Sequence, residues 1–518
     1  MSITKRIAFG AAASWFSRGV SILLGLVLLP VLFRHLPKEE LGVWLLLGQS
    51  WAALGIFDLG FGATLTRRIA FAKGKSGSDP GAALTDETLR EIADLVATGK
   101  RVYRALAVFA FVFSLSAGFF YLRTLHLGAV PFSQVWLAWS VICLSQALGV
   151  WANVWNCILL GVGYVGWDAV LGSLASALTL LAQIIVVFFG GGLVALAVVA
   201  AAGALTQRFL MLGFARSRRP EIFAIRGQWN FSLVKGMTPL ALRAWATALG
   251  AVLVLNTDQI LIASMRGTAA VPAYRAAFVL IHNLTVVAVT LGLASSVFIS
   301  HLWQAGEIKN VHRIVERNVR LGWLTMLTGS ACLLVIGRQL FELWLGPGNF
   351  IGFAVIGAFL VTETLETQSY IIATASRATE DEAFAFSAVA GGVLKLTLSW
   401  LFARQFGLLG IAMGTVVGLL LTNHWYMVYR GLRRLKISLR EYVKTILLPC
   451  GLVFPVMLGG LWGVRSLCHE TAPIVQLASV SLTALLMFGG AVWLLVLEPG
   501  QRARVGRALG RNKNNALT

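Results

Sequence analysis

Two arginines stand inside long stretches of apolar and small residues. Arg18 lies in ASWFSRGVSILLGL and shares a helix face with Ser14 and Ser21, and Arg243 shares one with Thr247. A guanidinium group offers paired donors to phosphate oxygens. We therefore expect the two arginines to bind an anionic, phosphate-bearing group that enters a hydrated cavity from the cytoplasm.

Carboxylates in the apolar stretches suggest ion pairs. Asp58 could pair with Arg18, whose side chain could otherwise extend to the nearer membrane surface. Asp258 and Arg275 lie near the ends of adjacent apolar stretches. We expect them to form an ion pair or an outer gate that breaks when the cavity opens.

A second acidic pair lies further along the chain. Glu363 and Glu366 share a helix face, and Lys395 lies at a similar depth in the next apolar stretch. We expect Glu363 to pair with Lys395. The alternative is a relay for a proton or another cation.

Neutral polar side chains also interrupt the apolar stretches, among them Gln146, Asn153 and His282. They could bind the hydroxyl groups of a sugar, or they could form hydrogen bonds between helices.

The sequence offers no sign of catalysis. The five cysteines are scattered and odd in number, which argues against a disulfide framework or a metal cluster. No nucleophile with a base, metal-ligand cluster or phosphate-binding glycine loop is apparent. We therefore expect neither an enzyme nor a bound cofactor, and the sequence leaves open whether a proton or sodium ion is coupled to the activity.

The composition requires a membrane protein. The chain has 518 residues, of which 58% are hydrophobic and 13% charged, against about 25% charged in soluble domains. Apolar stretches of about 20 residues can cross a bilayer as helices. We expect an all-α polytopic protein with about 14 spans, near 11–33, 41–61, 102–122, 134–160, 168–189, 192–214, 237–262, 272–298, 318–337, 351–374, 384–405, 407–429, 445–465 and 474–496.

Most lysines and arginines fall in alternate connections between these spans, which predicts that both termini are cytoplasmic. The net charge of +21 is then an orientation signal and an attraction to anionic lipid. We expect no nucleic-acid partner. The first span follows a short basic segment without a cleavage site, so we expect it to be retained.

Two connections have structure of their own. Residues 84–104 show an amphipathic helical pattern with Thr85 or Asp86 as N-cap, and 216–236 alternates basic and aromatic residues as an interfacial linker would. A weak repeat places Arg18 and Arg243 in equivalent helices. We expect an N-terminal lobe over 1–215, the linker over 216–236, a C-terminal lobe over 237–430, two extra helices over 431–496 and a basic cytoplasmic tail over 497–518.

Several sequence segments carry a family resemblance: WFSRGVSILLGLVLLPVLFRHLPKEELGVW, FDLGFGATLTRRIA, GVGYVGWDA, PAYRAAF and ELWLGPGNF. With these segments in this order, the chain resembles the polysaccharide transporter branch of the multidrug, oligosaccharidyl-lipid and polysaccharide (MOP) flippase superfamily. This branch includes O-antigen-type flippases and is related to lipid II flippases. The resemblance implies two six-helix lobes in a V around a central cavity, with two further helices at the C-terminal end.

The resemblance also implies a function. The protein would move an undecaprenyl-pyrophosphate-linked oligosaccharide from the inner to the outer leaflet of a bacterial inner membrane, for the synthesis of surface polysaccharide. A polymerase and glycosyltransferases of the same pathway would be its partners, beside membrane lipids. The alternatives are a multidrug or cation antiporter of the same superfamily and a non-transporting subunit of a glycan-export complex. A cation exporter should carry acidic groups where this chain has Arg18.

Overall fold

The secondary structure is helical. A computed structural model describes residues 3–76, 81, 83–379 and 385–503, and gives the backbone alone for 3–15, 17, 18, 51–54, 291, 294, 297, 301 and 385. Across the described residues there are helices and no strands. The predicted all-α class is confirmed.

Eleven of the described segments are long and apolar enough to cross a membrane. One of them, Phe386–Arg434, has 49 residues and covers two of the expected spans. The other expected spans without a segment of their own, 11–33 and 351–374, fall on the helices α1 and α14. The chain is a multi-pass membrane protein.

Two compact units make up the chain. Unit 1 comprises Met1–Ala276 and Ala385–Gly414, and unit 2 comprises Ala277–Phe384 and Thr415–Thr518. The predicted lobes divide the chain at other residues, after the repeat and the family resemblance, and stay a prediction. The greater part of the predicted tail, 504–518, lies outside the described residues.

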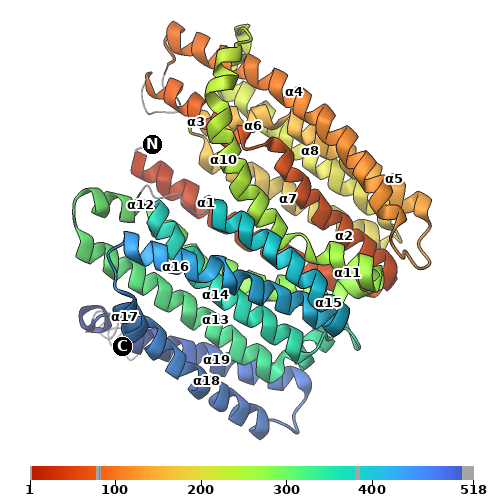
Figure 1. The fold of residues 1–518 in the computed structure, drawn as a ribbon, viewed down its shortest axis with the longest axis vertical. Coiled ribbons are helices and arrows are strands. Elements are labelled where there is room, and N and C mark those ends of the chain that lie inside the picture. Colours follow the sequence, from red (N-terminus) through yellow and green to blue (C-terminus); the bar gives the residue numbers. More distant parts are fainter. Residues whose placement is uncertain (1–2, 77–80, 82, 380–384, 504–518) are drawn as a thin grey trace, which may run out of the picture. The chain divides into compact units, whose positions relative to one another are not determined.

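Unit 1 holds the first half of the chain (Figure 1). Its main core lies among α3, α4 and α6, where Ile69, Ile92 and Ile158 are buried. Its elements are α1 (Ile3–His35), α2 (Lys38–Leu54), η1 (Gly55–Asp58), α3 (Phe61–Gly74), α4 (Asp86–Arg123), α5 (Phe132–Trp151), α6 (Asn153–Val162), α7 (Val165–Phe188), α8 (Leu193–Arg218), α9 (Pro220–Ala224), α10 (Phe231–Leu255), α11 (Asp258–Arg266) and η2 (Thr268–Ala270).

The predicted amphipathic helix is the first part of α4. Thr85 caps it by accepting a hydrogen bond from the Thr88 amide, and α4 then continues without a break for 38 residues into the membrane span. Leu89, Ile92 and Val96 are buried on one face, as the spacing predicts. The predicted linker packs on this helix, where the main-chain N–H of Gln228 donates to Asp94 Oδ1 at 2.6 Å.

A left-handed glycine sets the turn between η1 and α3. Gly60 has φ 70°, and a Cβ there would lie 2.2 Å from the Ala241 carbonyl oxygen of α10. Only glycine combines this conformation with this close approach. The turn holds Asp58 at the end of η1.

Unit 2 is built around α13, which packs against α14, α18 and α19 (Figure 1). Two long helices, α12 (Val271–Gln304) and α15 (Ala385–Leu421), run from one unit into the other, and α15 contains the left-handed Gly407, with φ 60°. The remaining elements are α13 (Ile308–Leu345), α14 (Phe353–Arg377), α16 (Asn423–Arg434), α17 (Leu439–Tyr442), η3 (Val443–Leu447), α18 (Leu448–Leu467) and α19 (Pro473–Leu495).

Candidate functional site

A polar cavity of about 390 Å³ lies within unit 1. This volume falls in the range of small-molecule sites, roughly 300–1,000 Å³. The cavity lies where η1, α5, α6 and α8 meet, close to the break between α5 and α6 at Ala152. Its lining residues are Gly55, Asp58, Ser145, Gln146, Gly149, Val150, Asn153, Ala204, Gln207 and Arg208.

Asp58 is held in place by three donors. Its carboxylate accepts hydrogen bonds from the Gly62 amide at 2.9 Å, the Tyr103 hydroxyl at 2.7 Å and the Asn153 side-chain amide at 3.0 Å. Tyr103 is fully buried in α4. The negative charge of Asp58 is therefore largely satisfied by the protein itself.

Arg208, in contrast to Asp58, lines the cavity without direct partners among the described residues. It lies ten residues before the C-terminal end of α8, so it is about 15 Å along the helix axis from that end. No hydrogen bond or ion pair involves its guanidinium group among the described residues, although Asp168 and Asp58 act on it electrostatically. Asp168 is itself bound by the Asn156 amide at 2.6 Å. Arg208 thus brings free donors to the cavity.

Two of the predicted sugar-binding residues line this cavity. Gln146 and Asn153 project from α5 and α6. The Asn153 amide nitrogen is already committed to Asp58 and to the Tyr103 hydroxyl oxygen, at 3.1 Å. Asn153 therefore makes the interhelix contacts that were the alternative, whereas Gln146 offers its amide to the cavity.

Of the two arginines of the predicted clamp, Arg243 is not among the described residues that line this cavity. The side chain of Arg18 lies outside the described residues, so its predicted place in a cavity and its predicted pairing with Asp58 stay predictions. Arg243 is exposed on α10, and its carbonyl accepts a hydrogen bond from the Thr247 hydroxyl at 3.2 Å.

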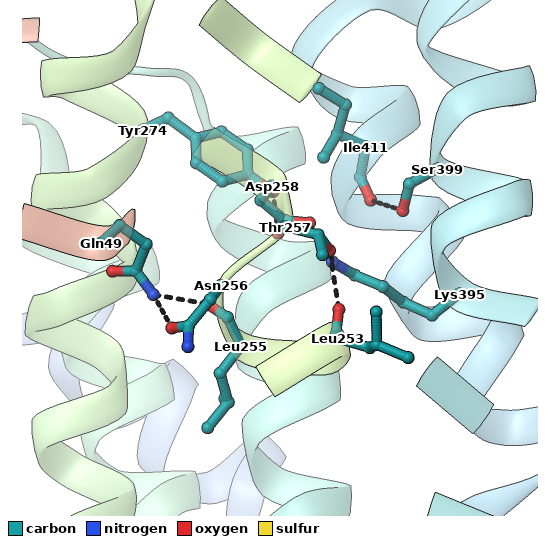
Figure 2. A network of polar contacts seen from close by, with 10 residues as sticks. All are labelled: Gln49, Leu253, Leu255, Asn256, Thr257, Asp258, Tyr274, Lys395, Ser399 and Ile411. Atoms are coloured by element: carbon teal, nitrogen blue, oxygen red, sulfur yellow. Dashed lines mark hydrogen bonds and ion pairs between the residues drawn. The ribbon is translucent and has the colours of Figure 1, made fainter. Parts of the chain in front are cut away.

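A second polar network joins α15 to the turn between α10 and α11 (Figure 2). The ammonium group of Lys395 contacts the Asp258 carboxylate and donates to the Thr257 hydroxyl at 2.8 Å. The Tyr274 hydroxyl donates to the other Asp258 oxygen at 2.9 Å. Arg275 lies within electrostatic range of Asp258. A role for these two residues as an outer gate stays a prediction.

The predicted pair of Glu363 and Lys395 is wrong. Lys395 is completely buried against Asp258 in unit 1. Glu363 has its partner in unit 2, where its carboxylate lies 3.1 Å from Nδ1 of His282. Each residue has another partner: Lys395 on α15 contacts the carboxylate of Asp258, and Glu363 on α14 contacts the imidazole of His282.

Glu366 and His282 also belong to the contacts around α14 in unit 2. Glu366 lies one turn after Glu363 on α14, and its carboxylate is 3.6 Å from Nδ1 of His424 on α16. His282 was expected either to bind sugar or to form contacts between helices. It contacts the Glu363 carboxylate of α14, and sugar binding by it stays a prediction.

Three residues of these sites were missed by the sequence reasoning: Arg208, Tyr103 and His424. Arg208 lies inside the expected span 192–214. Its depth within the span was the available signal. Nothing local distinguishes Tyr103 or His424 from other polar residues in helices.

Solved structures of transporters share this fold. The lipid II flippase MurJ in an inward closed conformation matches with a TM-score of 0.68 at 13% identity, over 94% of this chain and 99% of that chain. An inward-facing multidrug resistance MATE family transporter of the MOP superfamily matches with 0.66 at 14% identity, over 82% and 98%. The chain has the fold of these transporters. No family model and no curated protein matches the sequence.

A third match is a MOP superfamily transporter from Pyrococcus furiosus that is described as having a binding pocket of reversed polarity, with a TM-score of 0.54 at 14% identity over 83% and 96%. The match to the lipid II flippase leaves out fewer residues than α18 and α19 hold together, 20 and 23. It therefore includes part of these two C-terminal helices.

Proposed function

We propose that the protein is a flippase that moves an undecaprenyl-pyrophosphate-linked oligosaccharide from the inner to the outer leaflet of a bacterial inner membrane by alternating access. The observation that carries this proposal is the unpaired guanidinium of Arg208 in the polar cavity of unit 1. The pathway of surface polysaccharide synthesis, with its polymerase and glycosyltransferases, would supply and consume the substrate.

An arginine within a membrane span is costly unless it has a partner or faces water. Arg208 has no direct partner in the described part of the chain, whereas the carboxylate beside it has three donors. A pyrophosphate would supply the missing acceptors, because guanidinium binds phosphate oxygens in a bidentate manner. The cavity is therefore better prepared for an anion than for a cation.

The glycan needs polar surroundings as well. Each hydroxyl moved into hydrocarbon without a partner costs several kcal/mol. The side chains of Gln146 and Gln207 line the cavity beside Arg208 and can bind hydroxyl groups. The proposal also keeps Arg18 and Arg243 as a first contact for the pyrophosphate on entry.

The rival function is transport of an organic cation, as in multidrug transporters. Asp58 favours it, because a carboxylate lines the cavity. The bonds from Tyr103, Asn153 and the Gly62 amide weigh against it, since a cation would have to replace them or share the carboxylate with them.

The test is binding of undecaprenyl pyrophosphate to the purified protein, measured by native mass spectrometry, with a lipophilic cation as competitor. Arg208→Gln should weaken binding about ten- to a hundredfold, because a hydrogen bond to a charged group contributes about 1.5–3 kcal/mol. Arg218→Gln is the matched control on the same helix, because Arg218 is exposed and stacks on Phe214.

Loss of pyrophosphate binding in the Arg208 variant alone supports the proposal. Equal binding by both variants refutes the role of Arg208. Binding of the lipophilic cation that disappears in Asp58→Asn establishes the rival function. A protein that binds neither probe, while the pathway needs its presence, fits the non-transporting subunit and overturns the proposal.

A further inference from the structure

Unit 2 contains a chain of four titratable side chains at the level of α14, outside the cavity described above. Glu363 and Glu366 are one helical turn apart on α14, which places their side chains side by side. Glu363 faces His282 of α12 at 3.1 Å, and Glu366 faces His424 of α16 at 3.6 Å. We call these four residues the His-Glu cluster.

Two members of the His-Glu cluster, Glu363 and His424, are almost inaccessible. Their side chains are 4% and 3% exposed, whereas those of Glu366 and His282 are 32% and 34% exposed. Two buried atoms have no hydrogen-bond partner, Oε2 of Glu366 and Nε2 of His424. A buried polar atom without a partner is costly, so its presence in a folded protein calls for an explanation.

The charges of the His-Glu cluster do not balance without added protons. Two ionised carboxylates with two neutral imidazoles would carry two negative charges in a region of low dielectric constant. Each proton taken up on an imidazole or a carboxylate removes one of them. Histidine makes this change between pH 5 and 8.

Among the described residues, Arg377 is the cation with permanent charge that is found to act on Glu366. The titratable and charged groups that face them are His282 from α12, His424 from α16 and, further along α14, Arg377. From α13 and α17 come only the Trp323 indole and the Tyr442 hydroxyl, which both donate to Gln368, at 3.1 and 2.9 Å.

The His-Glu cluster meets accessible space at both of its ends. The His424 side chain is 3% exposed but borders a cavity of about 370 Å³ among α14, α16 and α17, where Gln368 and Tyr442 add polar groups to a mostly apolar lining. The His282 side chain, at the other end, is 34% exposed. A proton can therefore reach His282 directly and His424 through the cavity.

We infer that the His-Glu cluster binds and passes the protons that drive transport. A proton that binds Nε2 of neutral His424 allows Nδ1–H to pass its proton to the Glu366 carboxylate, which becomes a carboxylic acid. Glu366 gives its proton to Glu363, and Glu363 gives its own to Nδ1 of neutral His282, which releases one to solvent. The coupling to transport rests on the proposed function, whereas proton binding by the cluster does not.

The first experiment therefore needs no substrate. Infrared difference spectra of the purified protein in lipid, taken across roughly pH 5 to 8, should show a protonated carboxyl band that is lost in Glu363→Gln and in Glu366→Gln. The His424→Gln variant should shift the pH at which the band appears. Glu342→Gln is the control, because Glu342 lies on the neighbouring α13 and forms an i,i+4 pair with Arg338.

The second experiment measures proton movement into vesicles that enclose a pH-sensitive dye, on addition of undecaprenyl pyrophosphate. Glu366→Gln should abolish the movement while binding of the lipid persists. The unfolding midpoint of each variant confirms that it is folded, and Glu366→Asp, which keeps the carboxyl group, should retain part of the movement.

A carboxyl band that survives in both glutamine variants overturns the inference. Retained proton movement in folded Glu366→Gln overturns it as well. If the wild-type protein does not bind undecaprenyl pyrophosphate but shows the protonated carboxyl band, the proposed function is contradicted and the proton site is still established.

Discussion

Removal of the Lys395 side chain should destabilise the protein strongly. In Lys395→Met the Asp258 carboxylate loses its cation but stays in place, with 14% of its side chain exposed. Breaking a buried ion pair by removing one partner costs about 3–5 kcal/mol. Because Asp258 keeps the hydrogen bond from the Tyr274 hydroxyl at 2.9 Å, we expect a loss near the lower limit, about 3 kcal/mol.

The measurement is reversible unfolding in mixed micelles, followed by tryptophan fluorescence. Lys75→Met is the matched control. Lys75 pairs with Glu91 at 2.7 Å, and the two side chains are 57% and 41% exposed. Solvent screens such a pair, so the unfolding midpoint should hardly move.

The double variant Lys395→Met with Asp258→Asn separates the pair from its surroundings. It removes both charges and leaves an acceptor for the Tyr274 hydroxyl, so it should be more stable than the sum of the single effects predicts, by about 0.5–3 kcal/mol. A loss below about 1 kcal/mol in Lys395→Met, typical of exposed pairs, would refute the reasoning that burial makes this contact strong.

Three further substitutions probe the surroundings of the polar cavity and the start of α4. Tyr103→Phe removes the hydrogen bond of 2.7 Å to Asp58 and should cost about 1.5–3 kcal/mol, measured by the same unfolding assay. Gly60→Ala forces a Cβ toward the Ala241 carbonyl oxygen at 2.2 Å, so it should reduce the yield of folded protein in size-exclusion chromatography. Thr85→Ala removes the N-cap of α4 and should cost about 1 kcal/mol, without loss of lipid binding.

Local signals in the sequence were sufficient for much of the fold. Hydrophobic length identified the membrane helices, and the cap at Thr85 with the spacing of Leu89, Ile92 and Val96 placed the start of α4 and its buried face. These features depend on residues within a few turns of each other.

Partners that are distant in the sequence could not be predicted in the same way. Lys395 and Glu363 were expected at similar depths in successive spans, but depth alone does not fix which helices touch. The contact of Lys395 with Asp258 (Figure 2) depends on how α15 packs against the turn before α11. The isolation of Arg208 is likewise a property of the packed helices and not of its neighbours in α8.

The discontinuity of unit 1 has a consequence for biosynthesis. Lys395 follows Asp258 by 137 residues, which takes a ribosome about 7–27 s to add. During that time all of 277–384 must emerge, while Asp258 lacks the buried ammonium group of Lys395. A nascent chain stopped before residue 385 would carry this carboxylate without its ion-pair partner, and we expect cellular proteases to degrade it faster than a chain that extends past Lys395.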